Sequence, residues 1–301
     1  MGRRKKGDPV HGWLVVDKPE GVTSTQVVGR ARWAFNAQKA GHAGTLDPLA
    51  TGLLAVAFGE ATKTVPYAQD GLKTYRFVAR WGEATTTDDR EGEVAETSPV
   101  RPTPADIEAV LPRFTGDIMQ TPPAFSAIKV DGRRAYDMAR KGEEVALAAR
   151  PIHIRRLTLT EVIDADHAAF EMVCGKGGYV RSMARDLALA LGSVGRVETL
   201  RRVESGGFTL NGALTFEGLE AMRADEGRGA RILPVSAGLA GLTEAPVSPE
   251  TARRLRAGDQ SAVPLIDEAA FWASDCGAPV AILGREDGLP VIHRVFAGLQ
   301  P

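Results

Sequence analysis

The arrangement of hydrophobic and polar residues along the chain indicates a protein built largely from β-strands. Residues 73–81, "KTYRFVARW", alternate between polar and apolar side chains, as a half-buried antiparallel strand does. Residues 12–17, "GWLVVD", and residues 53–58 are short apolar runs of the length expected for buried strands. Further strands are predicted at residues 152–160, 168–174 and, as one strand-like unit, 195–208.

Two segments have the apolar spacing of helices. Residues 23–35, "TSTQVVGRARWAF", begin with Thr23 or Ser24 as a candidate N-cap. Residues 180–191, "VRSMARDLALAL", predict an amphipathic helix preceded by the glycine-rich "GKGGY". Shorter elements are predicted at residues 60–70 and 104–111 (helices), 128–132 (a strand and turn) and 133–141 (a basic helix). The chain is therefore expected to be an α+β protein dominated by antiparallel strands.

The length of 301 residues allows one large domain and one small domain. A boundary is predicted near residues 242–250, after which "PVAILGREDGLPVIHRVF" places two apolar runs around a polar turn. The N-terminal "MGRRKKGDPV" is basic without an apolar segment behind it, so a cationic arm is favoured over a secretory signal. No apolar run approaches the roughly 20 residues that span a bilayer, so a cytoplasmic protein with no membrane partner is expected.

Charge and cysteine content restrict the possible functions only a little. The net charge is −1, but residues 129–156 contain 8 basic and 4 acidic side chains. This basic segment suits phosphate contact, and a solvated helix face with ion pairs explains it equally well. Cys174 and Cys276 are far apart with no cysteine or histidine nearby, so neither a disulfide nor a metal site is predicted. Both are expected to be small buried hydrophobes.

The segment 41–52, "GHAGTLDPLATG", is the most distinctive candidate for chemistry, because it places one carboxylate, Asp47, just before an apolar strand. An ordinary turn and a catalytic loop both fit this pattern. The sequence contains no phosphate-binding GxxxxGK[ST] loop, no dinucleotide fingerprint and no HExxH pair. Four other candidates are Lys18, His42, Tyr75 and Arg181, each of which, taken singly, has an ordinary structural interpretation.

Taken together, five segments in order favour one family: "GWLVVDKPEGVTSTQVV", "GHAGTLDPLATGLLAVAFGEATK", "KTYRFVARWG", "PPAFSAIKVDGRRAYDMARKGEEV" and "CGKGGYVRSMARDLALALG". They closely resemble the bacterial TruB family, the tRNA pseudouridine synthases that isomerise uridine 55 in the T-loop. The likeness runs from about residue 12 to about residue 208, and "GTLDPLATG" is its most specific block. It implies the pseudouridine synthase fold, with a mainly antiparallel mixed sheet flanked by helices.

The resemblance also implies catalytic roles. Asp47 matches the family's catalytic aspartate, and Arg181 matches the arginine that pairs with it and keeps the carboxylate charged. Tyr75 matches the tyrosine that stacks on the flipped uracil and takes part in proton transfer. The reaction gains and loses no atoms, so no cofactor and no metal is expected. Whether the aspartate adds to the base, attacks C1′ or removes the 2′ proton stays open.

Substrate contacts are implied in the same way. His42 matches the histidine that fills the space left by the flipped base, and Tyr179 and Leu200 match residues of the uracil pocket. Lys18, with Pro19, matches a family motif interpreted as packing that supports the active-site loop. Residues 121–150 correspond to an RNA-gripping insertion, with the candidate phosphate contacts Lys129, Arg133, Arg134, Arg140 and Lys141.

The domain organisation implied by the resemblance is an arm at residues 1–10, a catalytic domain at 11–240 and a small PUA-like β-domain at 245–301. Residues 216–301 contain 12 acidic and 8 basic side chains, which argues against strong phosphate contact there. The alternative within the superfamily is a guide-RNA-dependent synthase of the dyskerin type. In that branch the equivalent insertion is much shorter, so an enzyme that acts without guide RNA is favoured.

A hypothesis from another class is a non-catalytic RNA-binding or RNA-folding protein that uses the same cleft. Asp47 discriminates between the two, because a pure binder gains nothing from a carboxylate where phosphates gather. Its presence with an available arginine favours catalysis. Ribosomal or messenger RNA loops that resemble a T-loop are further possible substrates, and a monomer is expected.

Overall fold

The computed structural model describes residues 7–126, 129–130, 133–134, 138, 147–297 and 299. The chain forms two compact units, each made of segments that are distant in sequence. Unit 1 consists of Met1–Asp47, Leu53–Gly71 and Ser205–Pro301, and unit 2 of Pro48–Gly52 and Leu72–Glu204. Among the described residues, no helix is long and apolar enough to cross a membrane.

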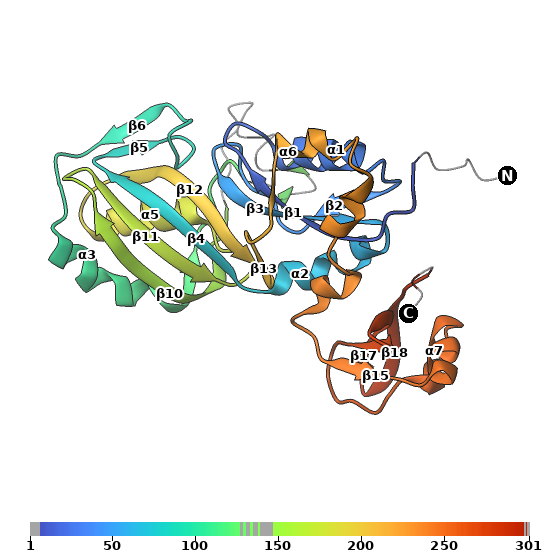
Figure 1. Ribbon diagram of the computed structural model, residues 1–301. Coiled ribbons are helices and arrows are strands. Elements are labelled where there is room, and N and C mark those ends of the chain that lie inside the picture. The colour runs from blue at the N-terminus through green and yellow to red at the C-terminus, as the bar shows by residue number, and fades with distance from the viewer. Residues whose placement is uncertain are drawn as a thin grey trace. The chain divides into compact units, whose positions relative to one another are not determined.

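Unit 1 contains a small set of paired strands with helices packed against them (Figure 1). Its strands are β1 (Gly12–Lys18), β2 (Ala40–His42), most of β3 (Thr51–Phe58), β13 (Phe208–Thr209) and β14 (Leu214–Thr215). Its helices before the C-terminal segment are α1 (Ser24–Ala34), η1 (Gly59–Lys63), α2 (Val65–Asp70), α6 (Gly218–Ala221), η3 (Glu226–Arg231) and η4 (Val235–Leu239). β14 pairs with β1 in parallel and β2 pairs with β3 antiparallel.

Strands β1 and β3 are buried on both faces, which explains their unbroken apolar sequences. Leu14 and Val16 of β1 pack with Val27 and Ala31 of α1, four residues apart on one face of that helix. The alternate residues of β1, Trp13 among them, belong to a second cluster on the other side. Helix α1 begins after Thr23, whose side chain forms a capping box with Gln26, so the predicted N-cap is confirmed.

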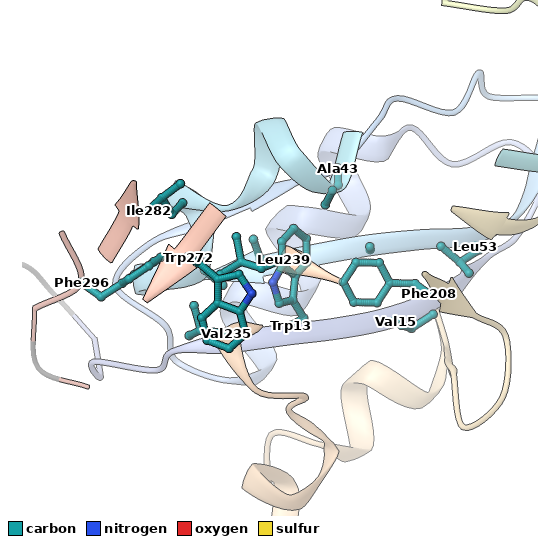
Figure 2. Close-up of a cluster of buried hydrophobic side chains, with 14 residues drawn as sticks. Trp13, Val15, Ala43, Leu53, Phe208, Val235, Leu239, Trp272, Ile282 and Phe296 are labelled. Atoms are coloured by element: carbon teal, nitrogen blue, oxygen red, sulfur yellow. The ribbon is translucent and has the colours of Figure 1, made fainter. Parts of the chain in front are cut away.

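The C-terminal segment of unit 1 forms its own sheet in the order β15-β16-β17-β18. The elements are β15 (Glu244–Pro246), α7 (Pro249–Arg256), η5 (Gln260–Ala262), β16 (Phe271–Asp275), β17 (Ala278–Glu286) and β18 (Leu289–Val295). Phe271 packs in a cluster within this segment, whereas its neighbour Trp272 joins the cluster that contains Trp13 and Leu239. Figure 2 shows Trp272, Ile282 and their partners in this shared cluster. The C-terminal sheet therefore buries one face in the core of unit 1.

Unit 2 is a sheet with the order β12-β4-β11-β10-β7, with α5 packed against β4 (Figure 1). The strands are β4 (Lys73–Trp81), β5 (Glu83–Thr85), β6 (Val94–Thr97), β7 (Gly116–Gln120), β8 (Lys129–Val130), β9 (Arg133–Arg134), β10 (Arg150–Val162), β11 (His167–Cys174) and β12 (Gly195–Ser205). The helices are α3 (Pro104–Val110), η2 (Leu111–Phe114) and α5 (Val180–Ala190). From β4 to β7 all neighbours are antiparallel, and β12 runs parallel to Thr51–Gly52, the first residues of β3.

Two expectations are wrong. Arg133 and Arg134 are not the start of a helix, because they form β9 and pair antiparallel with Val130 and Lys129 of β8. Their extended backbone pairs with another strand, so it does not make the local hydrogen bonds of a helix. The rest of the predicted basic helix, apart from residue 138, lies outside the described residues.

The second wrong expectation concerns the cysteines. Cys174 is buried in β11 as predicted, but Cys276 is exposed. It has φ 48° and lies between β16 and β17, next to Gly277 with φ 81°. A left-handed turn between two strands turns its residues toward solvent, so the apolar character of the thiol does not decide its position.

Candidate functional site

Asp47 lies in the loop that joins β2 to β3, and buried residues flank it on both sides. Leu46 is 4% exposed and Leu49 2%, whereas Asp47 is half-buried. The amide of Leu46 donates to Ser24 Oγ (2.9 Å), and the same hydroxyl donates to the Leu46 carbonyl (3.0 Å). The carboxylate is thus attached to a loop whose backbone is held, despite its three glycines.

The glycine at the end of this loop has a structural reason. Gly52 has φ 97°, and a Cβ atom there would lie 2.2 Å from the backbone carbonyl oxygen of Arg202. Thr51 and Gly52 pair with Arg201 and Arg202 of β12, which brings the two backbones this close. Part of the distinctive sequence pattern therefore serves strand pairing rather than chemistry.

Lys18 is fully buried at the end of β1. Its Nζ atom donates to the carbonyls of Pro19 (2.9 Å) and Val22 (2.6 Å), so it closes the turn that leads into α1. This turn leads directly into α1, whose first residue, Ser24, is hydrogen-bonded to Leu46. Lys18 therefore supports the Asp47 loop indirectly, through the start of α1.

His42 is the last residue of β2, opposite Val56 of β3 and half-buried. It belongs to unit 1, as do Lys18 and Asp47. Four other candidate residues, Tyr75, Tyr179, Arg181 and Leu200, belong to unit 2.

Arg181 is the second residue of α5 and only 4% exposed. Its guanidinium donates to the carbonyls of Thr87 and Phe125, both at 2.9 Å, and lies 3.6 Å from Asp89 Oδ2. Two carbonyls and a carboxylate therefore fix the direction of this cation. Tyr179, the N-cap of α5, exchanges two backbone hydrogen bonds with the side chain of Gln120 (2.9 and 3.1 Å).

Tyr75 and Leu200 occupy neighbouring strands of the unit 2 sheet. Tyr75 is a half-buried residue of β4 opposite Met172, and Leu200 is 7% exposed in β12. The carbonyl of Leu200 accepts from Thr51 Oγ1 at 3.4 Å. β4 and β12 are hydrogen-bonded neighbours, so the two candidates lie on adjacent strands of one sheet.

Sequence reasoning missed Asp89, which lies in the polar run "TTTDDREGE". This carboxylate is 3% exposed; its Oδ1 accepts from Thr87 Oγ1 (2.5 Å) and the Glu91 amide (3.0 Å), besides facing Arg181. Its neighbour Asp88 pairs with Arg185 at 2.8 Å. Burial raises the pKa of Asp88 against the opposing effect of the cation.

The basic insertion is described in part. Lys129 lies in β8, and Arg133 and Arg134 form β9, with Arg133 exposed. Arg140 and Lys141 lie outside the described residues.

Residues 32–180 match the model of the TruB family pseudouridylate synthase N-terminal domain, and residues 181–240 match that of the tRNA pseudouridylate synthase B C-terminal domain. The chain is 56% identical to tRNA pseudouridine synthase B of Dinoroseobacter shibae over 98% of both chains. It is 47% identical to tRNA pseudouridine synthase B of Mesorhizobium japonicum over 99% of this chain and 100% of that one.

Solved structures give the same fold. One chain of a crystallised Cbf5–Nop10–Gar1 complex is similar with a TM-score of 0.73 at 22% identity, covering 95% of this chain and 85% of that one. A chain of the archaeal box H/ACA sRNP Nop10–Cbf5 complex is similar with a TM-score of 0.72 at 21% identity, over 99% and 93%. The predicted fold class is confirmed.

Proposed function

Because the chain belongs to the TruB family and is a tRNA pseudouridine synthase, we propose that it isomerises uridine 55 in the T-loop of tRNA. The enzyme acts without guide RNA, as a monomer in the cytoplasm. In the reaction the N1–C1′ bond breaks, the uracil turns, and a C5–C1′ bond forms. C5 loses its proton and N1 gains one, so the atoms balance without a cofactor.

Asp47 is the catalytic carboxylate in this proposal. The observation that carries it is the way the loop presents this side chain: Leu46 and Leu49 are buried, whereas Asp47 between them is half-buried. A reactive group on an anchored backbone keeps its orientation from one turnover to the next, which lowers the entropic part of the barrier. Addition to the base, attack at C1′ and removal of the 2′ proton each use this carboxylate in its charged form.

Arg181 and Tyr75 assist. The guanidinium of Arg181 is held by the carbonyls of Thr87 and Phe125 and faces Asp89, so its orientation is set before RNA arrives. Preorganised charge of this kind is effective in a site from which water is excluded. Tyr75 offers an apolar face for the uracil and a hydroxyl for proton transfer.

RNA binding is assigned to the remaining candidates. The T-loop uridine is flipped out of its stack, His42 fills the vacated space, and Tyr179 and Leu200 line the uracil pocket. Lys129, Arg133, Arg134, Arg140 and Lys141 contact phosphates of the T-stem loop. We also propose that residues 1–10 are a basic arm, 11–240 the catalytic domain and 245–301 a PUA-like accessory segment.

The test is a single-turnover assay on an unmodified tRNA transcript with no other RNA present. Wild type is compared with Asp47→Asn and with Glu217→Gln, a control that removes one carboxylate charge from an exposed site in the same unit. Pseudouridine is mapped by position, and RNA binding is measured in the same samples. A transcript with cytidine at position 55 checks the assigned target.

We expect conversion at position 55 by wild type and Glu217→Gln, and tRNA binding without conversion by Asp47→Asn. Conversion by Asp47→Asn at the wild-type rate would refute the catalytic role of this residue. Conversion at another position would refute the T-loop assignment. Binding and refolding of tRNA without conversion by any form would favour the RNA-folding alternative.

A further inference from the structure

Ser24 connects the start of helix α1 to the loop that carries Asp47. It is the first residue of α1 and 3% exposed. Its hydroxyl donates to the Leu46 carbonyl at 3.0 Å and accepts from the Leu46 amide at 2.9 Å, across 22 residues of sequence. A serine hydroxyl has one donor and two acceptor sites, and here its donor and one acceptor serve a single loop residue.

Capping of the helix does not explain this arrangement, because Thr23 does the capping. Thr23 Oγ1 accepts from the Gln26 amide at 3.2 Å, and Gln26 Oε1 accepts from the Thr23 amide at 2.8 Å. The capping box is therefore complete without the hydroxyl of Ser24. That hydroxyl is available for the loop alone.

The bonded groups control the backbone from which Asp47 projects. The Leu46 carbonyl belongs to the same rigid peptide plane as the Asp47 amide nitrogen, so a hydrogen bond to that carbonyl fixes the plane on the N-terminal side of Asp47. On the C-terminal side, Pro48 restricts Asp47 itself to extended conformations. The direction of the Cα–Cβ bond of Asp47 is thus constrained by Ser24 on one side and by proline on the other.

We infer that Ser24 is a positioning residue for Asp47: it holds the Leu46 peptide so that the carboxylate meets the substrate in a reactive orientation. This inference rests on the proposed catalytic role of Asp47. Ser24→Ala leaves the polar atoms of a buried backbone segment without their partner, and the loop shifts to satisfy them. A displacement of about 1 Å at a reacting group costs on the order of 10²-fold in rate.

The neighbouring Thr23 provides a matched control. Thr23→Ala removes a hydroxyl from the same end of the same helix and weakens the helix, but it leaves the bonds to Leu46 intact. Both variants are assayed by single turnover at saturating tRNA transcript, at a temperature where circular dichroism shows them folded. Should Ser24→Ala not fold, both are made in a Gly29→Ala background; Gly29 lies inside α1, and a Cβ there meets nothing within 4 Å.

We expect Ser24→Ala to lose about 10- to 100-fold in the single-turnover rate, with its affinity for tRNA within about twofold of wild type. Thr23→Ala should keep the wild-type rate despite a similar fall in melting temperature. Equal rates in the two variants, with Asp47→Asn inactive, would overturn the role of Ser24 alone. A wild-type rate in Asp47→Asn would overturn the role of Asp47 and this inference with it.

Discussion

Trp272→Ala should destabilise the core of unit 1, although Trp272 lies in the C-terminal sheet. The indole is 6% exposed and packs in one cluster with Trp13, Val235 and Leu239 (Figure 2). Replacing a buried tryptophan by alanine costs about 3–5 kcal/mol, as lost transfer free energy and a residual cavity. That loss raises the ratio of unfolded to folded protein by roughly 10²- to 10⁴-fold.

Amide hydrogen exchange shows which part of unit 1 is destabilised by Trp272→Ala. The amide of Trp13 donates to the Leu233 carbonyl at 2.8 Å, and the Leu233 amide donates back at 2.7 Å, so both amides report on the centre of unit 1. In Trp272→Ala these amides should exchange faster, because the cluster that covers β1 has lost its largest C-terminal member. The matched control is Phe271→Ala, in which a fully buried ring is lost from the other face of β16.

Phe271→Ala should speed exchange in β17 more than in β1, because Phe271 packs within the C-terminal segment. If Trp272→Ala leaves the exchange of Trp13 and Leu233 unchanged while β16 opens, the C-terminal sheet is an independent domain. That outcome would show that the shared cluster does not couple the C-terminal sheet to the core of unit 1. If exchange accelerates as expected, the C-terminal sheet is an integral part of the unit that carries Asp47.

Two other predictions concern the backbone and the thiols. Gly52→Ala should lower the free energy of unfolding by about 2–3 kcal/mol or more, because φ 97° and the nearby carbonyl of Arg202 both oppose a Cβ atom. Gly29→Ala should raise the free energy of unfolding by up to about 1 kcal/mol, because alanine is the better helix former and its Cβ meets nothing there. The urea concentrations at the unfolding midpoints measure both changes. Burial raises the pKa of the Cys174 thiol to about 12, so at pH 8 a disulfide reagent should label only the exposed Cys276 until denaturant is added. Rapid labelling of two thiols per folded molecule would contradict the burial of Cys174.

The sequence predicted those elements whose pattern is set by their own burial. Strand β4 matches its predicted bounds because one half-buried face imposes strict alternation. β1 and β3 were predicted as apolar runs because clusters cover both faces, and α5 because its apolar stripe packs against the unit 2 sheet. Each of these signals is local, so it can be found in a short window of sequence.

Features that depend on distant partners were not predictable in this way. The two carbonyls that hold Arg181 are 94 and 56 residues away, and Ser24 bonds across 22 residues. Asp89 lies in a polar run whose composition is that of a solvated turn, yet tertiary packing buries it. In each case the partner is set by the fold, and no periodicity in the sequence encodes it. The resemblance identified Arg181 through its motif, and the structure supplied what holds it.

The loop around Asp47 has a particular place in the organisation of the chain. Unit 1 ends a segment at Asp47, unit 2 takes Pro48–Gly52, and unit 1 resumes at Leu53. On the unit 1 side the backbone is fixed through Ser24 and Leu46, and on the unit 2 side through the pairing of Thr51–Gly52 with β12. A carboxylate on a loop with one anchor before it and another after it is sensitive to damage at either anchor. Substitutions at these anchors should therefore lower the reaction rate before they abolish tRNA binding, since the proposed binding surface is spread over many residues and the proposed reacting group is one.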